Sequence, residues 1–294
     1  MRYYRILAGA AALLLPLCSA SFAQGRCSLD TVRGTWGWQS HGTAMISDPG
    51  SPAPKPVPYA SLGIMEVDFQ GRYTAHATIS VGGQIQEVDF PGFVLVNADC
   101  TATDMYTIGP AEGMDRLVIL GNGDEIEGMP VKHPLGPVAG TFRFRRITQG
   151  NRKPRCTAHM VRGVYAGLRE GTQMMPIPGQ AGLVPVPFSA IHTGTIRNDG
   201  TDTAASAASM GGVIANFEFP SVSIAVNPDC TATMRYTGVS TQFPGQMFTG
   251  AVKYIVLNQG DELIGMDIEA NPGLPGVVLD NLKRISMAPV VLGQ

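Results

Sequence analysis

The sequence predicts an all-β protein made of two tandem antiparallel barrels, each with eight up-and-down strands and one disulfide. Three observations lead to this prediction. The chain repeats itself with a period of about 130 residues, apolar residues alternate with polar ones in short runs, and glycine and proline are frequent, with 36 and 22 copies. Charged residues make up only 15% of the chain, against a typical value of about 25%. Two β-sandwiches are the alternative architecture.

The first residues, 1–23, are expected to be a secretory signal peptide. Two arginines precede the apolar run Ile6–Leu17, which is shorter than the roughly 18 residues that cross a bilayer. Small residues at Ser21 and Ala23 then predict cleavage near Ala23. A lipoprotein signal that uses Cys18 is the alternative. We therefore expect a secreted or periplasmic protein without a membrane span.

The repeat consists of four pairs of matching segments. They occur in the same order in both halves: Cys27–Trp36 and Cys156–Tyr165, Val96–Thr103 and Val226–Thr233, Gly123–Met129 and Gly260–Met266, and Arg145–Ile147 and Lys283–Ile285. This period is too long for a solenoid unit of roughly 20–50 residues, and long enough for each copy to own a core. We therefore expect a first barrel domain at 25–149, a linker at 150–155, a second barrel domain at 156–287 and a tail at 288–294.

Copy one contains eight strand-like runs. We expect strands at residues 34–45, 58–68, 72–81, 84–96, 100–108, 115–121, 125–132 and 139–147. In the third run, Tyr73, Ala75 and Ala77 alternate with polar residues, as in a strand with one face in a core. Gly82-Gly83 is typical of a tight hairpin turn. Closing the eight strands into a barrel would remove exposed edges.

Four cysteines remain after cleavage of the signal peptide. Four cysteines allow three pairings, but the duplication favours Cys27–Cys100 and Cys156–Cys230, because each copy then closes its own loop. The sequence contains no Cys-x-x-Cys, so we expect structural disulfides rather than a redox pair or metal thiolates. In the chain-entropy model, loops of this length are worth about 4 kcal/mol each.

Each copy opens on a Gly-x-aromatic element and ends near an arginine. Gly34-Thr35-Trp36 opens the first copy and Gly163-Val164-Tyr165 the second, while Arg146 and Arg284 come late in each. This arrangement resembles the calycin superfamily, whose lipocalins begin with Gly-x-Trp and pack a late arginine on that tryptophan. The Asp99–Thr103 element is also similar to small exported barrels related in shape to allene oxide cyclase. The resemblance implies an architecture in which each arginine lies on an aromatic ring, and it implies no particular activity.

Aromatic and arginine side chains on the predicted inner faces are the candidate ligand-binding residues. They are Trp36, Trp38, Tyr106, Tyr165, Tyr236, Arg146 and Arg284. Tyr106 and Tyr236 are matched between the copies, and each hydroxyl either caps a cavity or makes one hydrogen bond within a core. Proline-rich loops at 47–58 and 172–187 join the first two strands of each copy. These loops are either lids over the barrel mouth or solvated spacers.

Composition and motifs argue against several classes of function. The net charge of −2 comes without a basic cluster, so we expect no nucleic-acid partner. The five histidines are scattered, and the sequence lacks His-x-His, His-Glu-x-x-His and Gly-x-Ser-x-Gly. We therefore expect no metal and no cofactor. The acidic pairs Asp124-Glu125 and Asp261-Glu262 follow glycines and are interpreted as turn residues.

Three functions remain open at this stage. The first is a binding protein that holds a small, mostly apolar molecule in a barrel cavity, which the small side chains of Thr201–Ser209 favour. The second is a structural or surface-interaction protein with filled barrels. The third is a cofactor-free isomerase or cyclase that acts inside one barrel, because Trp38, His41 and Glu127 occur only in copy one. We favour binding over catalysis, and the oligomeric state stays open.

Overall fold

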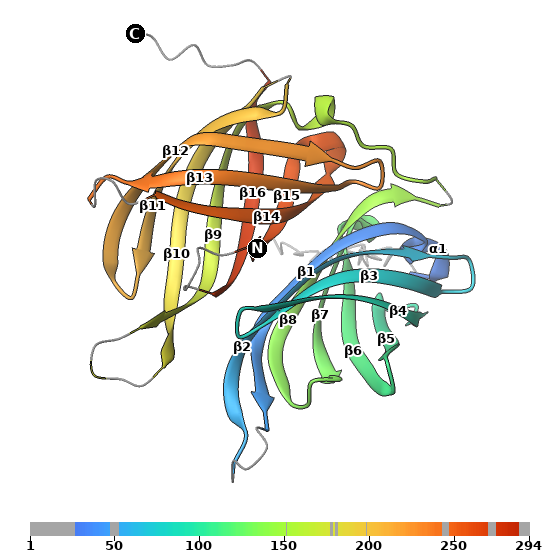
Figure 1. Ribbon diagram of the computed structural model, residues 1–294. Coiled ribbons are helices and arrows are strands. Elements are labelled where there is room, and N and C mark those ends of the chain that lie inside the picture. The colour runs from blue at the N-terminus through green and yellow to red at the C-terminus, as the bar shows by residue number, and fades with distance from the viewer. Residues whose placement is uncertain are drawn as a thin grey trace, which may run out of the picture.

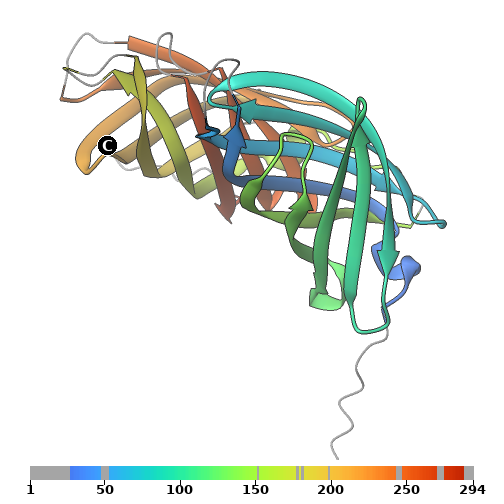
Figure 2. The ribbon, with the colours of Figure 1, turned by 90° about the horizontal axis from the view of Figure 1, so that it is seen from below.

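The computed structural model describes residues 27–47, 53–150, 152–176, 179, 182–197, 199–242, 247–269 and 275–287. Within these segments the chain forms two closed antiparallel β-barrels that lie side by side (Figure 1). The view from below shows the same two barrels next to each other (Figure 2). The predicted signal peptide at 1–23 and the tail at 288–294 lie outside the described residues.

The first barrel contains eight strands, each of which pairs with the next one along the chain. They are β1 (Gly34–Ile46), β2 (Lys55–Val67), β3 (Arg72–Val81), β4 (Gln84–Val96), β5 (Thr101–Ile108), β6 (Ala111–Leu120), β7 (Glu125–Lys132) and β8 (Val138–Gln149). β8 returns to pair with β1 and closes the barrel. A one-turn helix, α1 (Leu29–Val32), precedes β1.

The second barrel repeats this order. Its strands are β9 (Gly163–Pro176), β10 (Leu183–Ile196), β11 (Thr201–Met210), β12 (Val213–Val226), β13 (Thr231–Ser240), β14 (Met247–Leu257), β15 (Glu262–Glu269) and β16 (Gly276–Ser286). Short 3-10 helices lie at Gly121–Gly123 in the first barrel, and at Ala158–Val161 and Asn258–Gly260 in the second. β16 pairs with β9 and closes this barrel.

The predicted fold class is confirmed, and the barrels rule out the sandwich alternative. The largest difference in strand bounds is at β6, which begins at Ala111 rather than at 115. It begins earlier because Ala111–Met114 pair with Met105–Ile108 directly across a tight turn. The short helices were not predicted, because a single turn carries no measurable helical period. In the described segments, no helix is long and apolar enough to cross a membrane.

Each barrel has one disulfide, and both predicted pairings are confirmed. The bonds are Cys27–Cys100 and Cys156–Cys230. Each one ties the segment before the first strand of its barrel to the turn before the fifth strand. Disulfides persist in oxidising compartments, which agrees with the expected extracellular or periplasmic location.

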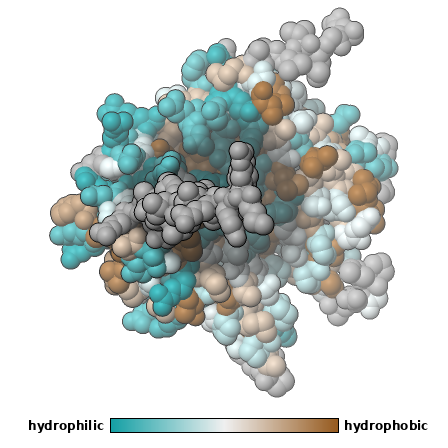
Figure 3. All heavy atoms as spheres, turned by 180° about the vertical axis from the view of Figure 1, so that it is seen from behind, coloured by the Kyte–Doolittle hydropathy of each residue, from teal (hydrophilic) through white to brown (hydrophobic). Residues whose placement is uncertain are grey.

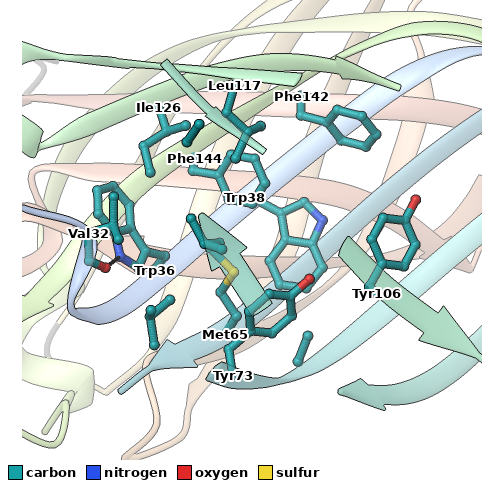
Figure 4. Packing of buried hydrophobic residues seen from close by; sticks show 14 of the residues in the cluster. Val32, Trp36, Trp38, Met65, Tyr73, Tyr106, Leu117, Ile126, Phe142 and Phe144 are labelled. Atoms are coloured by element: carbon teal, nitrogen blue, oxygen red, sulfur yellow. Dashed lines mark hydrogen bonds between the residues drawn. The ribbon is translucent and has the colours of Figure 1, made fainter. Parts of the chain in front are cut away.

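Aromatic and aliphatic residues together form the core of the first barrel (Figure 4). Trp36 is completely buried, and its Nε1 donates a hydrogen bond of 2.7 Å to the carbonyl of Val32 in α1. Two residues further along β1, Trp38 packs among Met65, Tyr73 and other core residues. Strand alternation places these side chains on one inner face, because successive residues of a strand point to opposite sides.

The two barrels also share an apolar interface between their outer walls. β2 of the first barrel contributes Ala60 and Leu62, and the second barrel contributes residues such as Ile255, Leu257 and Met266 from β14 and β15. All five are almost fully buried. Polar contacts border this cluster, among them an ion pair between the Nζ of Lys253 and the Oε1 of Glu87 at 3.0 Å. The barrels therefore pack on each other in addition to being joined by the linker.

Candidate functional site

One end of each barrel is plugged by its late arginine. In the first barrel the guanidinium of Arg146 lies 4.3 Å from the ring centre of Trp36. Its Nε donates to the carbonyl of Gly123 at 2.9 Å, and its Nη1 donates to the carbonyl of Arg33 at 2.9 Å. The carboxylate of Asp124 completes the cluster at 3.2 Å. The arginine thus binds the 3-10 turn and the entry segment to the barrel end.

The second barrel has the same plug with a tyrosine in place of the tryptophan. The guanidinium of Arg284 lies 5.9 Å from the ring centre of Tyr165, whose hydroxyl donates to the carbonyl of Gly260 at 2.6 Å. The Nε of Arg284 donates to Asp261 at 2.9 Å. The arginine-on-aromatic arrangement that the resemblance implied is therefore present in both barrels.

A small cavity of about 40 Å³ lies in the other half of the first barrel. Its apolar wall includes Trp38, Phe90 and Phe144, and the ring centre of Trp38 lies 6.2 Å from that of Phe90 and 6.1 Å from that of Phe144. Pockets for drug-sized ligands have volumes of about 300–1,000 Å³. This cavity therefore has room for a group of a few atoms rather than for a whole ligand of that size.

Two buried carboxyl groups face each other at this cavity. Asp104 of β5 pairs in register with Asp115 of β6, and both border the cavity and are at least 96% buried. The hydroxyl of Tyr73 donates to Asp104, at 2.8 Å from Oδ1 and 3.0 Å from Oδ2. Within the described part of the chain, the Oδ1 atom of Asp115 has no hydrogen-bond partner. The pair therefore contains one buried oxygen without a hydrogen-bond partner among the described residues, on a residue that borders the cavity.

Burial makes both carboxyl groups weak acids. Desolvation raises the pKa of Asp104 to about 7, although the hydrogen bond from Tyr73 acts in the opposite direction. Desolvation also raises the pKa of Asp115 to about 8, and the neighbouring charge of Asp104 adds to this effect. Two carboxyl groups that share a site resist losing both protons, because like charges repel strongly in a poorly solvated interior. Near neutral pH the pair can therefore both donate and accept a proton.

Polar side chains continue from the acid pair toward the open end of the barrel. Ser40 Oγ lies 3.1 Å from the hydroxyl of Tyr59 and 2.7 Å from Ser61 Oγ. His133, in the connection between β7 and β8, makes an edge contact with Tyr59, with ring centres 5.2 Å apart. Desolvation lowers the pKa of His133 to about 4, so its ring is neutral at pH 7. This histidine borders the cavity from the mouth of the barrel.

The second barrel buries a different set of charges. Arg169 of β9 forms an ion pair with Asp267 of β15 and lies 3.8 Å from Asp280 of β16. Asp280 also contacts His192 at 2.9 Å and accepts a hydrogen bond from the hydroxyl of Tyr254 at 2.5 Å. Burial alone would raise the pKa of Asp280, but His192, Arg169 and Tyr254 together hold it below its ordinary value. This cluster is a paired charge network, in contrast to the acid pair of the first barrel.

The register of the two copies shows that the acid pair is specific to the first barrel. In the second barrel, the matching positions on β13 and β14 are Met234 and Val252, which pair with each other in the same way. A polar pair is therefore replaced by an apolar one in a barrel of the same topology. This difference argues that the acid pair is not required to build the fold.

The predicted ligand-binding residues separate into two groups. Trp38 and Tyr106 border the cavity, while Trp36 and Arg146 belong to the plug at the other end of the first barrel. In the second barrel, Tyr236 packs against Phe219 and Phe248, and Tyr165 and Arg284 form the plug. Contact of any of these residues with a ligand stays a prediction.

The catalytic trio considered for copy one is not assembled. Trp38 points into the barrel, whereas His41 and Glu127 border a crevice on the outer wall next to Glu170 of the second barrel. The reason is strand alternation, since residues three apart on one strand point to opposite faces. The acidic pairs after Gly123 and Gly260 were interpreted as turn residues, and they do lie at turns, where Asp124 and Asp261 also bind the late arginines.

The acid pair was not predicted from the sequence, although one signal for it was present. Asp104 lies between Ala102 and Tyr106 on their inward face, so alternation alone places its carboxyl group inside the barrel. Asp115 gives no comparable local signal, because the predicted strand began there. Among the described residues, no group of three or more histidine, cysteine, aspartate and glutamate side chains is arranged to hold a metal ion.

Comparisons with solved structures found matches of low sequence identity and low structural similarity. No family model and no curated protein matches the sequence, so membership in the calycin superfamily is not shown. A protein of unknown function from the DUF3598 family of Nostoc punctiforme is 13% identical, with 90% of this chain and 99% of that chain covered and a TM-score of 0.26. Transferrin-binding protein B of Haemophilus parasuis is 10% identical, with 85% and 76% covered and a TM-score of 0.23. A putative outer membrane protein of Bacteroides fragilis is 12% identical, with 87% and 98% covered and a TM-score of 0.24. These scores are too low to support any functional argument.

Proposed function

We propose that the first barrel is a binding module for a small molecule with a hydrogen-bond-donating head group and an apolar body. The main supporting observation is that Asp115 borders the cavity and that its buried Oδ1 atom has no hydrogen-bond donor among the described residues. An unsatisfied buried acceptor costs about 1–3 kcal/mol. A guest that donates a hydrogen bond to this atom removes that penalty. The relief of the penalty then contributes to the free energy of binding.

The size and lining of the cavity define the guest further. About 40 Å³ accommodates a head group, and the apolar remainder would lie along Phe142 and Ile108 toward the mouth, where His133 would have to move aside. A protonated amine suits the head group, because it offers several donors and a positive charge to a pair of carboxyl groups. The sequence indicated a mostly apolar guest, whereas the acid pair favours a guest with one polar, hydrogen-bond-donating end.

Binding of primary alkylammonium ions tests this function. The chain has two tryptophans, so Trp36→Phe leaves Trp38, in the cavity wall, as the reporter of occupancy by fluorescence. We expect a saturable signal that strengthens from methylammonium to hexylammonium. We also expect tighter binding at pH 9 than at pH 6, because the pKa values of about 7 and about 8 leave more carboxylate at high pH.

The variant Asp115→Asn in the same background should weaken binding at least tenfold, while Asp89→Asn, on the outer wall, should leave it unchanged. Native mass spectrometry of the purified mature protein provides an independent measurement, since a co-purified amine would appear as a defined mass increment. Absence of a saturable signal with every amine at pH 9, or equal binding by Asp115→Asn, would refute the proposal.

A surface-interaction function is the second candidate. The filled interior of the first barrel favours it, as does an open groove of about 1050 Å³ that crosses the outer wall over β2 to β6. The groove follows Gly92 and Gly113, which carry no side chains, and Phe93 and Met105 border it. If the folded protein binds none of the amines tested, this second function is favoured.

A further inference from the structure

The contact between the two barrels joins two different surfaces. The first barrel uses the outer face of β2 with Leu62 at its centre, and Ile147 of β8 packs beside it. The second barrel uses the outer faces of β14 and β15, including Ile255, Leu257 and Met266. Because the barrels are copies of each other, each one also carries the counterpart of the surface that its neighbour uses. A contact of this heterologous kind can be repeated from one molecule to the next.

The first barrel still exposes an apolar counterpart of the β14–β15 surface. Alignment of the two repeats matches Val118 with Ile255, Leu120 with Leu257, Met129 with Met266 and Val131 with Ile268, and the strand registers agree for the first three pairs. In the first barrel Val118 is 47% exposed, Met129 58% and Val131 53%, whereas Ile255 and Met266 are buried in the interface. We call Val118, Leu120, Met129 and Val131 the β6–β7 face.

The second barrel likewise exposes a counterpart of the β2 surface. Ile191 on β10 matches Leu62, Leu168 on β9 matches Gln39, and Ile285 on β16 matches Ile147. Ile191 is 65% exposed and Ile285 64%, although the residues they match pack against the apolar interface cluster. We call Leu168, Ile191 and Ile285 the β9–β10 face. In the view from behind, hydrophobic residues form separate patches among hydrophilic ones (Figure 3).

The volumes at the two faces also complement each other. In the intramolecular interface, Gly37 is covered by Ile255, so that a Cβ on Gly37 would lie 2.7 Å from the Cγ2 atom of Ile255. At the matching positions, alanine (Ala166) replaces the glycine and the smaller valine (Val118) replaces the isoleucine. The added methyl group on one side is balanced by the lost methylene group on the other. The ion pair at the interface is not repeated: Lys253 is matched by another base, Arg116, but its partner Glu87 is matched by the neutral Asn216.

We propose that the chain assembles head to tail, with the β9–β10 face of one molecule on the β6–β7 face of a second copy. The contact repeats the geometry that already joins the two barrels, so it propagates into short linear oligomers rather than closed pairs. At least two substitutions make it weaker than the intramolecular contact. Asn216 takes the place of Glu87, so the ion pair with the interface base is lost. Glu127, paired with Arg143 at 3.2 Å, occupies the place of the buried Ile264. Assembly therefore depends on protein concentration.

Sedimentation velocity of the mature protein over a range of concentrations tests this assembly. We expect the weight-average mass to rise with concentration for the wild type. Ile191→Asp and Met129→Asp each damage one face, and both positions are more than half exposed, so the fold should survive. Each variant alone should remain monomeric, because its damaged face cannot meet the intact face of another copy. Val213→Asp, at an exposed apolar residue outside both faces, is the matched control and should assemble like the wild type.

A mixture of the two variants decides the polarity. Ile191→Asp retains the β6–β7 face and Met129→Asp retains the β9–β10 face, so equal amounts should form dimers and nothing larger. A wild type that stays monomeric at every concentration overturns the proposal. The proposal is also overturned if both single variants still assemble, because a different surface would then be responsible. It is overturned as well if only one of the two variants fails to assemble, because the contact would then not join the two faces.

Discussion

Trp36 and Trp38 lie two residues apart on β1 and point into the same barrel, yet they do different things. Trp36 donates a hydrogen bond to the carbonyl of Val32, and the guanidinium of Arg146 stacks over its ring. Trp38 donates a longer hydrogen bond of 3.3 Å to Ser61 and borders the cavity. A tyrosine takes the place of Trp36 in the second copy, whereas a glycine, Gly167, takes the place of Trp38. At the scale of the residue, one tryptophan belongs to the plug and the other to the site.

Truncation of the two tryptophans should therefore have unequal costs. We expect Trp36→Ala to lower the free energy of unfolding by about 3–5 kcal/mol, as deletion of a large buried aromatic side chain does. Trp38→Ala should cost less and should change amine binding. Urea denaturation of both variants measures the difference, and equal losses would show that Trp38 is ordinary core.

The acid pair should make stability fall as pH rises. The pKa values of Asp104 and Asp115 are raised from 3.8 to about 7 and about 8, so the folded state holds more protons than the unfolded state between these values. Burial of His133 has the opposite effect between its lowered pKa of about 4 and its ordinary value of 6.5. Between pH 6.5 and 8 the carboxyl groups dominate, and the free energy of unfolding should decrease.

Asp115→Asn should reduce this dependence on pH and stabilise the protein at pH 9 by about 1–3 kcal/mol, because it removes a buried charge. Thermal melts of both proteins from pH 6 to 9 provide the measurement. If the slopes of wild type and Asp115→Asn agree, the carboxyl groups are already ionised in the folded barrel at low pH and the raised pKa values are wrong.

At the scale of the element, a tyrosine on β5 packs over a glycine on the neighbouring strand β6. Tyr106 lies over Gly113, its partner in register, and Tyr236 lies over Gly250 in the second barrel in the same way. A Cβ on Gly113 would be 2.1 Å from the Cζ atom of Tyr106. The glycines therefore provide the space in which the rings lie flat against the sheet.

Gly113→Ala should consequently cost about 1–3 kcal/mol through overpacking. In a Tyr106→Ala background the same change should become stabilising by roughly 0.5–1 kcal/mol, since alanine restricts the unfolded chain more than glycine does. Chemical denaturation of the four proteins in this cycle gives the coupling. A loss of the same size in both backgrounds would mean that the ring is not what excludes the side chain.

At the scale of the whole molecule, the two barrels combine separate cores with a shared interface. Each barrel has its own hydrophobic cluster and its own disulfide. A third cluster joins their outer walls, with Leu62 and Met266 among its fully buried members. The linker is therefore not the only connection between the copies, and each barrel covers apolar surface of the other.

The oxidised fragment 25–149 should nevertheless melt cooperatively, because its core and its disulfide are internal. Separation exposes Leu62 and its neighbours, so we expect the fragment to associate more readily than the full chain. Leu62→Ser in the fragment should reduce this association without abolishing the cooperative melt, as calorimetry and light scattering would show. A fragment that unfolds without a cooperative transition would contradict the predicted domain boundary.

Local and repeated features were predictable from the sequence alone. Alternation over Tyr73, Ala75 and Ala77 indicated strands with one inner face, and two matching cysteine pairs indicated one disulfide per copy. These predictions succeeded because side-chain direction in a strand depends only on position along it. The duplication then supplied a second copy against which each assignment was tested, so the fold followed from the pattern with small errors in strand bounds.

Only the tertiary structure decided which distant residues meet. The carboxyl groups of Asp104 and Asp115 become neighbours through the register of β5 with β6, and their pKa values rise only because the closed barrel excludes water from both. The apolar contact between Leu62 and Ile255 likewise depends on how two finished barrels dock. Strand period constrains the direction of a side chain but not its partner across the sheet, and desolvation is a property of the assembled fold. For that reason the sequence determined the barrels and their disulfides, while the three-dimensional structure determined the acid pair, its cavity and the faces that remain exposed.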